Sequence, residues 1–102
     1  MKFELTASFE RDFASLSKAE QRIVRERLPD FVAACERFAA DPTVPFPKAL
    51  RVKGVEGAPG IFEITFNVAG PDIRATFEWT RVGGDLAVRW RRIGGHEVFR
   101  AP

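Results

Sequence analysis

Apolar and polar residues alternate along several stretches of the chain, and each such stretch predicts a β-strand. The first covers residues 2–7, with Phe3 and Leu5 on the side opposite Lys2 and Glu4, which is the period of a half-buried strand. The same alternation recurs later, over residues 50–55, 61–68, 73–80 and from Asp85 up to the glycine pair at 94–95. Turn-forming residues separate these stretches at 57–60, 69–72 and 83–84, so the sequence predicts a sheet built mainly of hairpins.

Two stretches between the first and second predicted strands have helical spacing instead. Residues 8–16 predict a short helix with Ser8 as a candidate N-cap. Ser17 and Glu20 form the capping-box pattern, so a longer helix should follow. Its apolar stripe consists of Val24, Leu28, Phe31, Cys35 and Phe38. Pro29 predicts a kink or a break in this helix, because proline lacks the N–H and clashes with the preceding turn.

The alternation gives the predicted sheet one apolar and one polar face. The two helices are the available cover for the apolar face. We therefore expect a single α+β domain over residues 1–102, with the N-terminal strand and two helices packed on one face of a mainly antiparallel sheet. Tight hairpin closure would pair Glu63 with Glu78, Thr65 with Thr76, Asn67 with Arg74, Glu78 with Arg89, and Thr76 with Arg91.

Positive charge is concentrated in the second half of the chain. Residues 48–102 carry 9 Lys/Arg against 6 Asp/Glu, whereas residues 1–47 carry 7 against 8, so the second half is where an anion is expected to bind. Arginines on the polar strand face suit phosphate oxygens; the alternative is a solvated face with ordinary cross-strand ion pairs. The aromatic residues of the strands point to the apolar side, which argues against the stacking platform of an RNA-recognition motif.

Composition excludes several other classes. One cysteine cannot form an internal disulfide, and neither a signal peptide nor a run of about 20 apolar residues is visible, so we expect a cytoplasmic protein with no membrane contact. With one His and one Cys, a structural zinc site is not expected, and without a Gly-rich phosphate loop no cofactor is expected either. The absence of a recognition helix predicts no specific DNA binding. Cys35, on the apolar stripe, is expected to be buried and unreactive.

Three segments, taken in order, carry a family resemblance. They are LRVKGVEGAPGIFEITF at residues 50–66, the strand that begins near Arg74, and RIGGHEVF at residues 92–99. Together with the preceding strand and helices they resemble the RelE/ParE superfamily of toxins from type II toxin–antitoxin systems, over essentially the whole chain. The resemblance implies a RelE-like fold and a cognate antitoxin that holds the toxin inactive.

The resemblance also implies an activity and a set of residues for it. Many RelE-like toxins cut mRNA on the ribosome without a metal, by attack of a 2′-hydroxyl on the adjacent phosphate, which requires a base, a cation and an acid. Arg74 matches the arginine that binds the scissile phosphate, and His96 falls near a residue that transfers protons, as an imidazole can at neutral pH. Arg91 is the candidate for a further catalytic cation. Lys48, Arg51, Lys53 and Arg89 are the candidates for RNA contacts.

Two other functions are compatible with the same resemblance. ParE-like members inhibit DNA gyrase and need no ribonuclease residues. A toxin fold that only binds an antitoxin is the third hypothesis, because this sequence has Glu63 and Thr65 where some nucleases carry lysines and Phe99 near where some use a tyrosine.

Overall fold

A computed structural model describes residues 1–67, 70 and 72–102 of the chain. Its elements follow in the order β1 (Lys2–Leu5), α1 (Ala7–Ser15), α2 (Lys18–Ala40), the 3₁₀ turn η1 (Lys48–Leu50), β2 (Lys53–Gly54), β3 (Phe62–Asn67), β4 (Ile73–Val82), β5 (Asp85–Gly94) and the 3₁₀ turn η2 (His96–Arg100). The predicted strand end at Val68, and the Ala69 and Pro71 positions of the predicted hairpin loop, lie outside the described residues.

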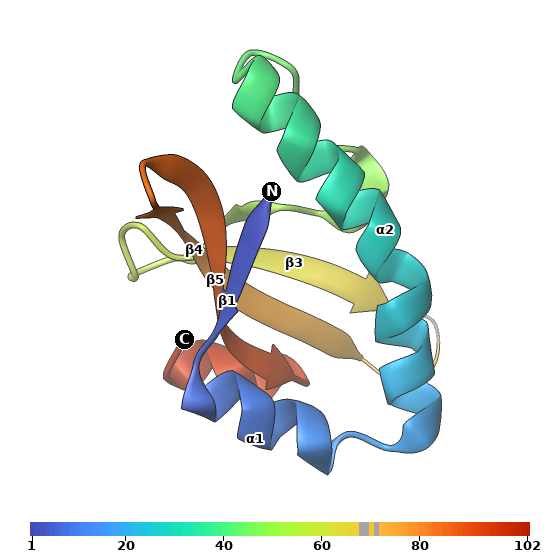
Figure 1. The fold of residues 1–102 in the computed structure, drawn as a ribbon. Helices are drawn as coiled ribbons and strands as arrows, with labels where there is room; N and C mark the ends of the chain where they lie inside the picture. Colours follow the sequence, from blue (N-terminus) through green and yellow to red (C-terminus); the bar gives the residue numbers. More distant parts are fainter. Residues whose placement is uncertain (68–69, 71) are drawn as a thin grey trace.

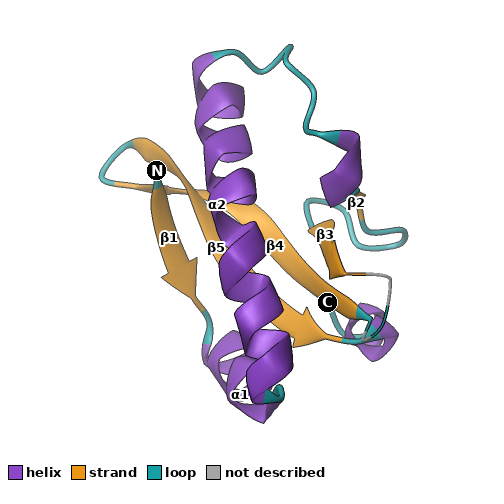
Figure 2. Cartoon of the chain, turned by 90° about the vertical axis from the view of Figure 1, so that its right-hand side faces the viewer, coloured by secondary structure: helices purple, strands orange, loops and turns teal. Residues whose placement is uncertain are grey.

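The strands form one sheet with the order β1-β5-β4-β3-β2. β1 runs parallel to β5, and the other neighbours are antiparallel. Figure 1 shows β1 beside β5, with α1 at one end of the sheet, and Figure 2 shows α2 crossing in front of β4 and β5. The predicted α+β architecture, with the two helices over one face of a mainly antiparallel sheet, is confirmed.

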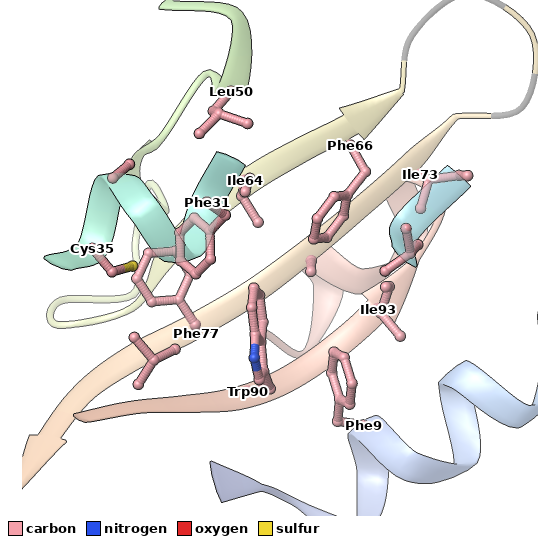
Figure 3. Packing of buried hydrophobic residues seen from close by; sticks show 14 residues of the cluster. Phe9, Phe31, Cys35, Leu50, Ile64, Phe66, Ile73, Phe77, Trp90 and Ile93 are labelled. Carbon is pink, nitrogen blue, oxygen red and sulfur yellow. The ribbon is translucent and has the colours of Figure 1, made fainter. Parts of the chain in front are cut away.

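Aromatic side chains fill the space between the helices and the sheet (Figure 3). Phe31 of α2 is fully buried, and its ring lies 5.2 Å from that of Phe77 and 5.1 Å from that of Trp90. Phe9 of α1 contacts the other side of this group, 5.5 Å from Trp90. Such ring pairs add stabilisation beyond the area they bury, so the apolar positions read from the sequence hold both helices on the sheet.

The helix starts are specified by local hydrogen bonds. The Ser17 hydroxyl accepts from the Glu20 N–H at 3.1 Å, and the Glu20 carboxylate accepts from the Ser17 N–H at 2.8 Å, which confirms the predicted capping box. The N-cap of α1 is Thr6, not Ser8: the Thr6 hydroxyl accepts from the Phe9 N–H at 3.1 Å. Threonine can cap as serine does, and here its hydroxyl also donates to the Arg91 carbonyl.

Pro29 lies inside α2 without interrupting it. The helix continues from Lys18 to Ala40, and Figure 1 shows it as a curved rod. Of the two outcomes predicted at Pro29, a kink or a break, the break is therefore wrong. Pro29 and Arg25, whose carbonyl would otherwise have bonded to the missing N–H, are both exposed. Water can satisfy that carbonyl, and helices bend in this way on their solvent side.

Residues 50–55 do not form the second strand that the alternation predicts. Instead Lys48–Leu50 is a 3₁₀ turn, Arg51 has left-handed backbone angles (φ 50°, ψ 42°), and only Lys53–Gly54 pairs as β2 with β3. Leu50 is nevertheless buried, and Arg51 and Lys53 are exposed, as the pattern predicts. The prediction that Leu50 points inward and that Arg51 and Lys53 point outward is confirmed, whereas the predicted strand over residues 50–55 is wrong.

The predicted register of the first hairpin is also wrong. Glu63 lies opposite Thr76 instead of Glu78, Thr65 lies opposite Arg74 instead of Thr76, and Asn67 lies opposite Ile73. The pairing between residues 62 and 65 is thus shifted by two residues. A two-residue shift keeps every side chain on its face, so hydrophobic patterning alone could not detect it.

The second hairpin follows the predicted register only near its turn. Glu78 pairs with Arg89 as predicted, but Thr76 pairs with Arg92. A bulge at Arg91 inserts one extra residue in β5, which explains why Trp90 and Ile93 both enter the core although three positions separate them. Beyond the bulge Arg74 lies directly opposite Gly94.

Candidate functional site

Arg74 and His96, far apart in the sequence, line the same hollow of about 490 Å³ on the polar side of the sheet. We call it the His96 hollow; its lining includes Lys53, Glu56, Glu63, Arg74, His96 and Phe99. The structure therefore brings together two of the three predicted catalytic residues and one predicted RNA contact. The site is formed by β2, β3, β4 and the chain after β5.

The end of β5 carries His96 to Arg74. Arg74 pairs with Gly94, and the chain reaches His96 two residues later. The Gly95 N–H donates to the Glu97 carboxylate at 3.0 Å, and a Cβ on Gly95 would lie 2.6 Å from the same carboxylate. A larger residue at this position would displace the Glu97 carboxylate, so Gly95 leaves room for the hydrogen bond that holds the chain where it leaves the sheet.

Phe99 joins the two predicted catalytic side chains. Its ring meets the His96 imidazole edge-to-face with 5.0 Å between centroids, and the Arg74 guanidinium carbon lies 5.8 Å from the same ring. The Nε of Arg74 donates to Asp72 at 2.9 Å, and no other hydrogen bond of this guanidinium to a described residue is found. Its remaining N–H groups can therefore bind an anion in the hollow.

Glu63 is a residue of this site that the sequence analysis did not assign to it. It is only 7% exposed, yet it lines the His96 hollow. Its carboxylate is 3.9 Å from the Lys53 ammonium. The alternation of β3 placed Glu63 on the polar face, but the wrong register set it beside Glu78 and away from Arg74. The sequence signal that could have identified Glu63 is a carboxylate predicted on the same sheet face as Arg74.

A second hollow, of about 270 Å³, adjoins the first. We call it the Arg51 hollow; it is lined by Arg51, Val52, Lys53, Glu63, Thr65 and Arg74. Lys53, Glu63 and Arg74 belong to both hollows, so the two form neighbouring parts of one surface. Lys48, also predicted to contact RNA, is exposed but is not among the residues lining either hollow.

Arg89 and Arg91 lie elsewhere on the polar face and are held by carboxylates. Glu78 accepts from Arg89 at 2.9 Å and from Arg91 at 3.0 Å. The Nε of Arg91 also donates to the Pro102 backbone oxygen at 3.0 Å. Neither arginine is among the residues lining the His96 hollow. The structure thus does not bring Arg91 to Arg74 and His96.

Arg92, the next residue, is tied to α1. Its Nε and Nη2 donate to the Asp12 carboxylate at 2.6 and 3.2 Å, and the Ile93 N–H donates to the same carboxylate at 3.2 Å. The hydrogen bond to Asp12 raises the pKa of Arg92 above its usual range. This link fixes the bulged part of β5 just before the chain turns toward His96.

The His96 hollow combines a cation that can hold a phosphate with two groups that can transfer protons, Glu63 and His96. Among residues 1–67, 70 and 72–102, no three His, Cys, Asp or Glu side chains come together as a set of metal ligands. Burial raises the pKa of the Cys35 thiol to about 12, which makes it a poor nucleophile. Within the described part of the chain, no helix is long and apolar enough to cross a bilayer.

Comparison with solved structures identifies the fold. A YoeB/ParE toxin from Agrobacterium tumefaciens superposes with a TM-score of 0.63 at 15% identity, over 94% of this chain and 99% of that one. A mutant of the E. coli toxin RelE in the free state superposes with a TM-score of 0.53 at 13% identity, over 95% and 84%. No family model and no curated protein sequence matches the chain. The chain therefore has the RelE/ParE toxin fold.

Proposed function

We propose that this protein is the toxin of a type II toxin–antitoxin pair, and that it cleaves mRNA on the ribosome, in the cytoplasm, without a metal. The observation that carries the proposal is that Arg74 and His96 line one hollow. The fold that the chain shares with YoeB/ParE and RelE toxins supports the toxin assignment. The ribonuclease assignment is supported by the place of Arg74 and His96 in this fold and by the chemistry of their side chains.

In the proposed reaction a 2′-hydroxyl of the RNA attacks the neighbouring phosphorus, and the bond to the 5′-oxygen of the next nucleotide breaks. Arg74 binds the phosphate oxygens, where negative charge increases in the transition state. Glu63 and His96 provide the two proton transfers, one from the attacking hydroxyl and one to the leaving oxygen. The exposed position of His96 suits a group that must accept or release a proton in each turnover.

The test is cleavage of mRNA on purified ribosomes by the wild type and by Arg74→Ala, His96→Gln and Glu63→Gln. We expect each variant to cleave at least about 100-fold more slowly and to relieve growth arrest on expression. Arg81→Ala is the matched control: Arg81 lies on β4 like Arg74 but is exposed and bonds to Gly84 in the distant turn. Wild-type protein treated with a chelator, which is removed before the ribosomes are added, should cleave at an unchanged rate. If Arg74→Ala and His96→Gln cleave as fast as wild type, the site is wrongly assigned.

A gyrase-directed toxin is the second candidate, because the name of one structural neighbour includes ParE. That activity would leave mRNA intact and trigger DNA-damage signalling on expression, so the same induced cultures separate the two functions. Normal growth on strong expression without an antitoxin, together with intact mRNA, would instead support a protein that only binds its antitoxin.

Each of these functions implies a cognate antitoxin as the partner. We expect a small protein with a DNA-binding domain and an acidic, amphipathic segment that lies over this domain and neutralises basic side chains. Co-expression with the product of the neighbouring reading frame should restore growth and yield a co-purifying complex. Failure to form any complex would contradict the toxin–antitoxin assignment.

A further inference from the structure

The segment that follows β5 packs back onto the polar face of the sheet. Thr76 of β4 is fully buried, and its hydroxyl donates to the Pro102 backbone oxygen at 3.0 Å. Val98, within η2, is 1% exposed, and a Cβ added to Gly94 at the end of β5 would lie 3.1 Å from its side chain. The segment that carries His96 is therefore held on the sheet both within η2 and just after it.

The bulge in β5 brings two consecutive arginines to this segment. The Nε of Arg91 donates to the same Pro102 oxygen at 3.0 Å, and Nη1 of Arg92 donates to the Ala101 carbonyl at 3.3 Å. Consecutive side chains of a regular strand point to opposite faces, whereas a bulge redirects one of them, and the register of β5 shifts at this point. We call Thr76, Arg91 and Arg92, together with the backbone of residues 101–102, the clasp.

The three donors of the clasp are themselves fixed in place. Thr76 lies within β4, and a buried hydroxyl is unfavourable without a partner, so it favours the packed position of the segment. Arg91 also donates to Glu78, and Arg92 also donates to Asp12 of α1. Both guanidinium groups are thus oriented by carboxylates before they bond to the segment, and they can hold it in one position.

We infer that Thr76, Arg91 and Arg92 are positioning residues of the proposed reaction, because their hydrogen bonds to residues 101–102 hold His96 in the hollow. This inference rests on the proposed ribonuclease function and assigns it residues that do not touch the RNA. The two arginines then act through the backbone of the segment and not as cations on the scissile phosphate.

The contacts inside the His96 hollow explain why the position of the segment matters. The Phe99 ring lies 5.8 Å from the Arg74 guanidinium carbon and 5.0 Å from the His96 imidazole. A shift of the segment would move Phe99 and His96 together away from Arg74, which belongs to β4. Proton transfer requires the side chain within hydrogen-bond reach of the reacting oxygen, and a misplacement of about 1 Å can slow a reaction about 100-fold.

The first measurement is single-turnover cleavage of mRNA on purified ribosomes. Thr76→Val removes the hydroxyl and keeps the branched shape. We expect its maximal rate to fall about tenfold, while the ribosome concentration for half of that rate changes less than about twofold, because binding contacts are retained. Thr76→Ser restores the hydroxyl and should restore the rate. Thr80→Val, the same substitution four residues along the same face of β4, is the matched control and should cleave as the wild type does.

The second measurement reports the position of the segment in the protein alone. Nuclear Overhauser contacts between the Phe99 ring and the Arg74 side chain should be present in the wild type, Thr76→Ser and Thr80→Val, and should weaken in Thr76→Val. Arg91→Met removes another donor of the clasp, leaves Thr76 intact and should weaken the same contacts, so the inference is testable even if Thr76→Val does not fold. If Arg91 were a catalytic cation, Arg91→Met would slow cleavage and leave these contacts unchanged.

The two measurements separate this inference from the proposed function. Wild-type cleavage by Thr76→Val overturns the positioning role and leaves the ribonuclease function standing. Slower cleavage with unchanged contacts between Phe99 and Arg74 also overturns it. If the wild type does not cleave mRNA at all, the proposed function falls, and the contacts still decide whether the clasp holds the segment in place.

Discussion

The polar face of the sheet has two ends that use arginine in different ways. Around β1 and β5, Arg89 bonds to Glu78 and lies 3.6 Å from Glu4, and Arg91 shares Glu78. At the β2–β3 end, Arg74 gives only its Nε to Asp72, and the Lys53–Glu63 separation is 3.9 Å. The cations of the first end are satisfied within the protein, and those of the second end remain available to a ligand.

The difference shows why a basic segment does not by itself indicate which of its side chains can bind a ligand. Arginine is abundant in β5, but its guanidinium groups are held by carboxylates and backbone oxygens. Ion pairs such as those of Arg89 and Arg91 with Glu78 hold the side chains in place. If a phosphate bound these arginines instead, the Glu78 carboxylate would remain beside the bound anion. Arg74 differs from these arginines in that it lies at a hollow and gives only its Nε to another described residue, Asp72, which is a property of the tertiary structure.

The largest expected effect comes from the same substitution made at each end of the face. Arg74→Lys should slow mRNA cleavage at least about tenfold, because a lysine is a point charge and cannot bind a phosphate through two parallel N–H groups. Arg91→Lys should cleave at nearly the wild-type rate. Single-turnover cleavage on ribosomes measures both. If Arg91→Lys slowed cleavage more than Arg74→Lys, catalysis would lie at the β5 end and Arg91 would be the catalytic cation.

The second effect concerns stability at the β5 end. Asp12→Ala removes the acceptor of three hydrogen bonds from Arg92 and Ile93 and should lower the free energy of unfolding by about 2 kcal/mol. Urea denaturation measures it. Asp30→Ala, at an exposed position of α2, is the control and should change the free energy of unfolding by less than about 0.5 kcal/mol. If Asp12→Ala and Asp30→Ala lowered the free energy of unfolding equally, the hydrogen bonds to Asp12 would contribute no more to stability than an exposed carboxylate does.

The smallest expected effect concerns Cys35, which is buried on the side of the sheet that the helices cover. Burial raises the pKa of Cys35 from the ordinary value of 9.0 to about 12, so the folded state disfavours the thiolate. This contribution to stability is complete below pH 9 and is lost as the pH rises toward 12. Urea midpoints measured near neutral pH and above pH 9 should show a decline that is smaller in Cys35→Ala. The chain has no tyrosine, and its four lysines, which titrate in the same range, are present in both proteins, so the difference between the two declines reports the thiol. An identical decline in the variant would contradict the burial of this thiol.

Local patterns in the sequence were sufficient for the covered half of the fold. The capping box at Ser17, the stripe through Phe31 and the alternation through Phe77 and Trp90 each depend on neighbours within a few residues. These patterns determine which side chains are buried and which element carries them. They therefore predicted the helices, the core and the face that the helices cover.

The site depended on features with no local pattern. The two-residue shift between β3 and β4 leaves the alternation unchanged, so Glu63 was placed beside the wrong partner. The bulge at Arg91 reverses the alternation without a glycine or proline to announce it. The 3₁₀ turn before Arg51 replaces a strand whose side-chain directions it nearly preserves. The resemblance nominated His96 and Arg74 together, and the hollow that both of them line came only from the structure.

The parallel pairing of β1 with β5 has a consequence for synthesis. β1 is separated from its partner strand by more than eighty residues of the chain, and α1 packs on that same late strand. Such long-range pairing delays closure of the core until the last strand has emerged. The hollow beside His96, which includes residues that follow β5, is therefore completed late in folding.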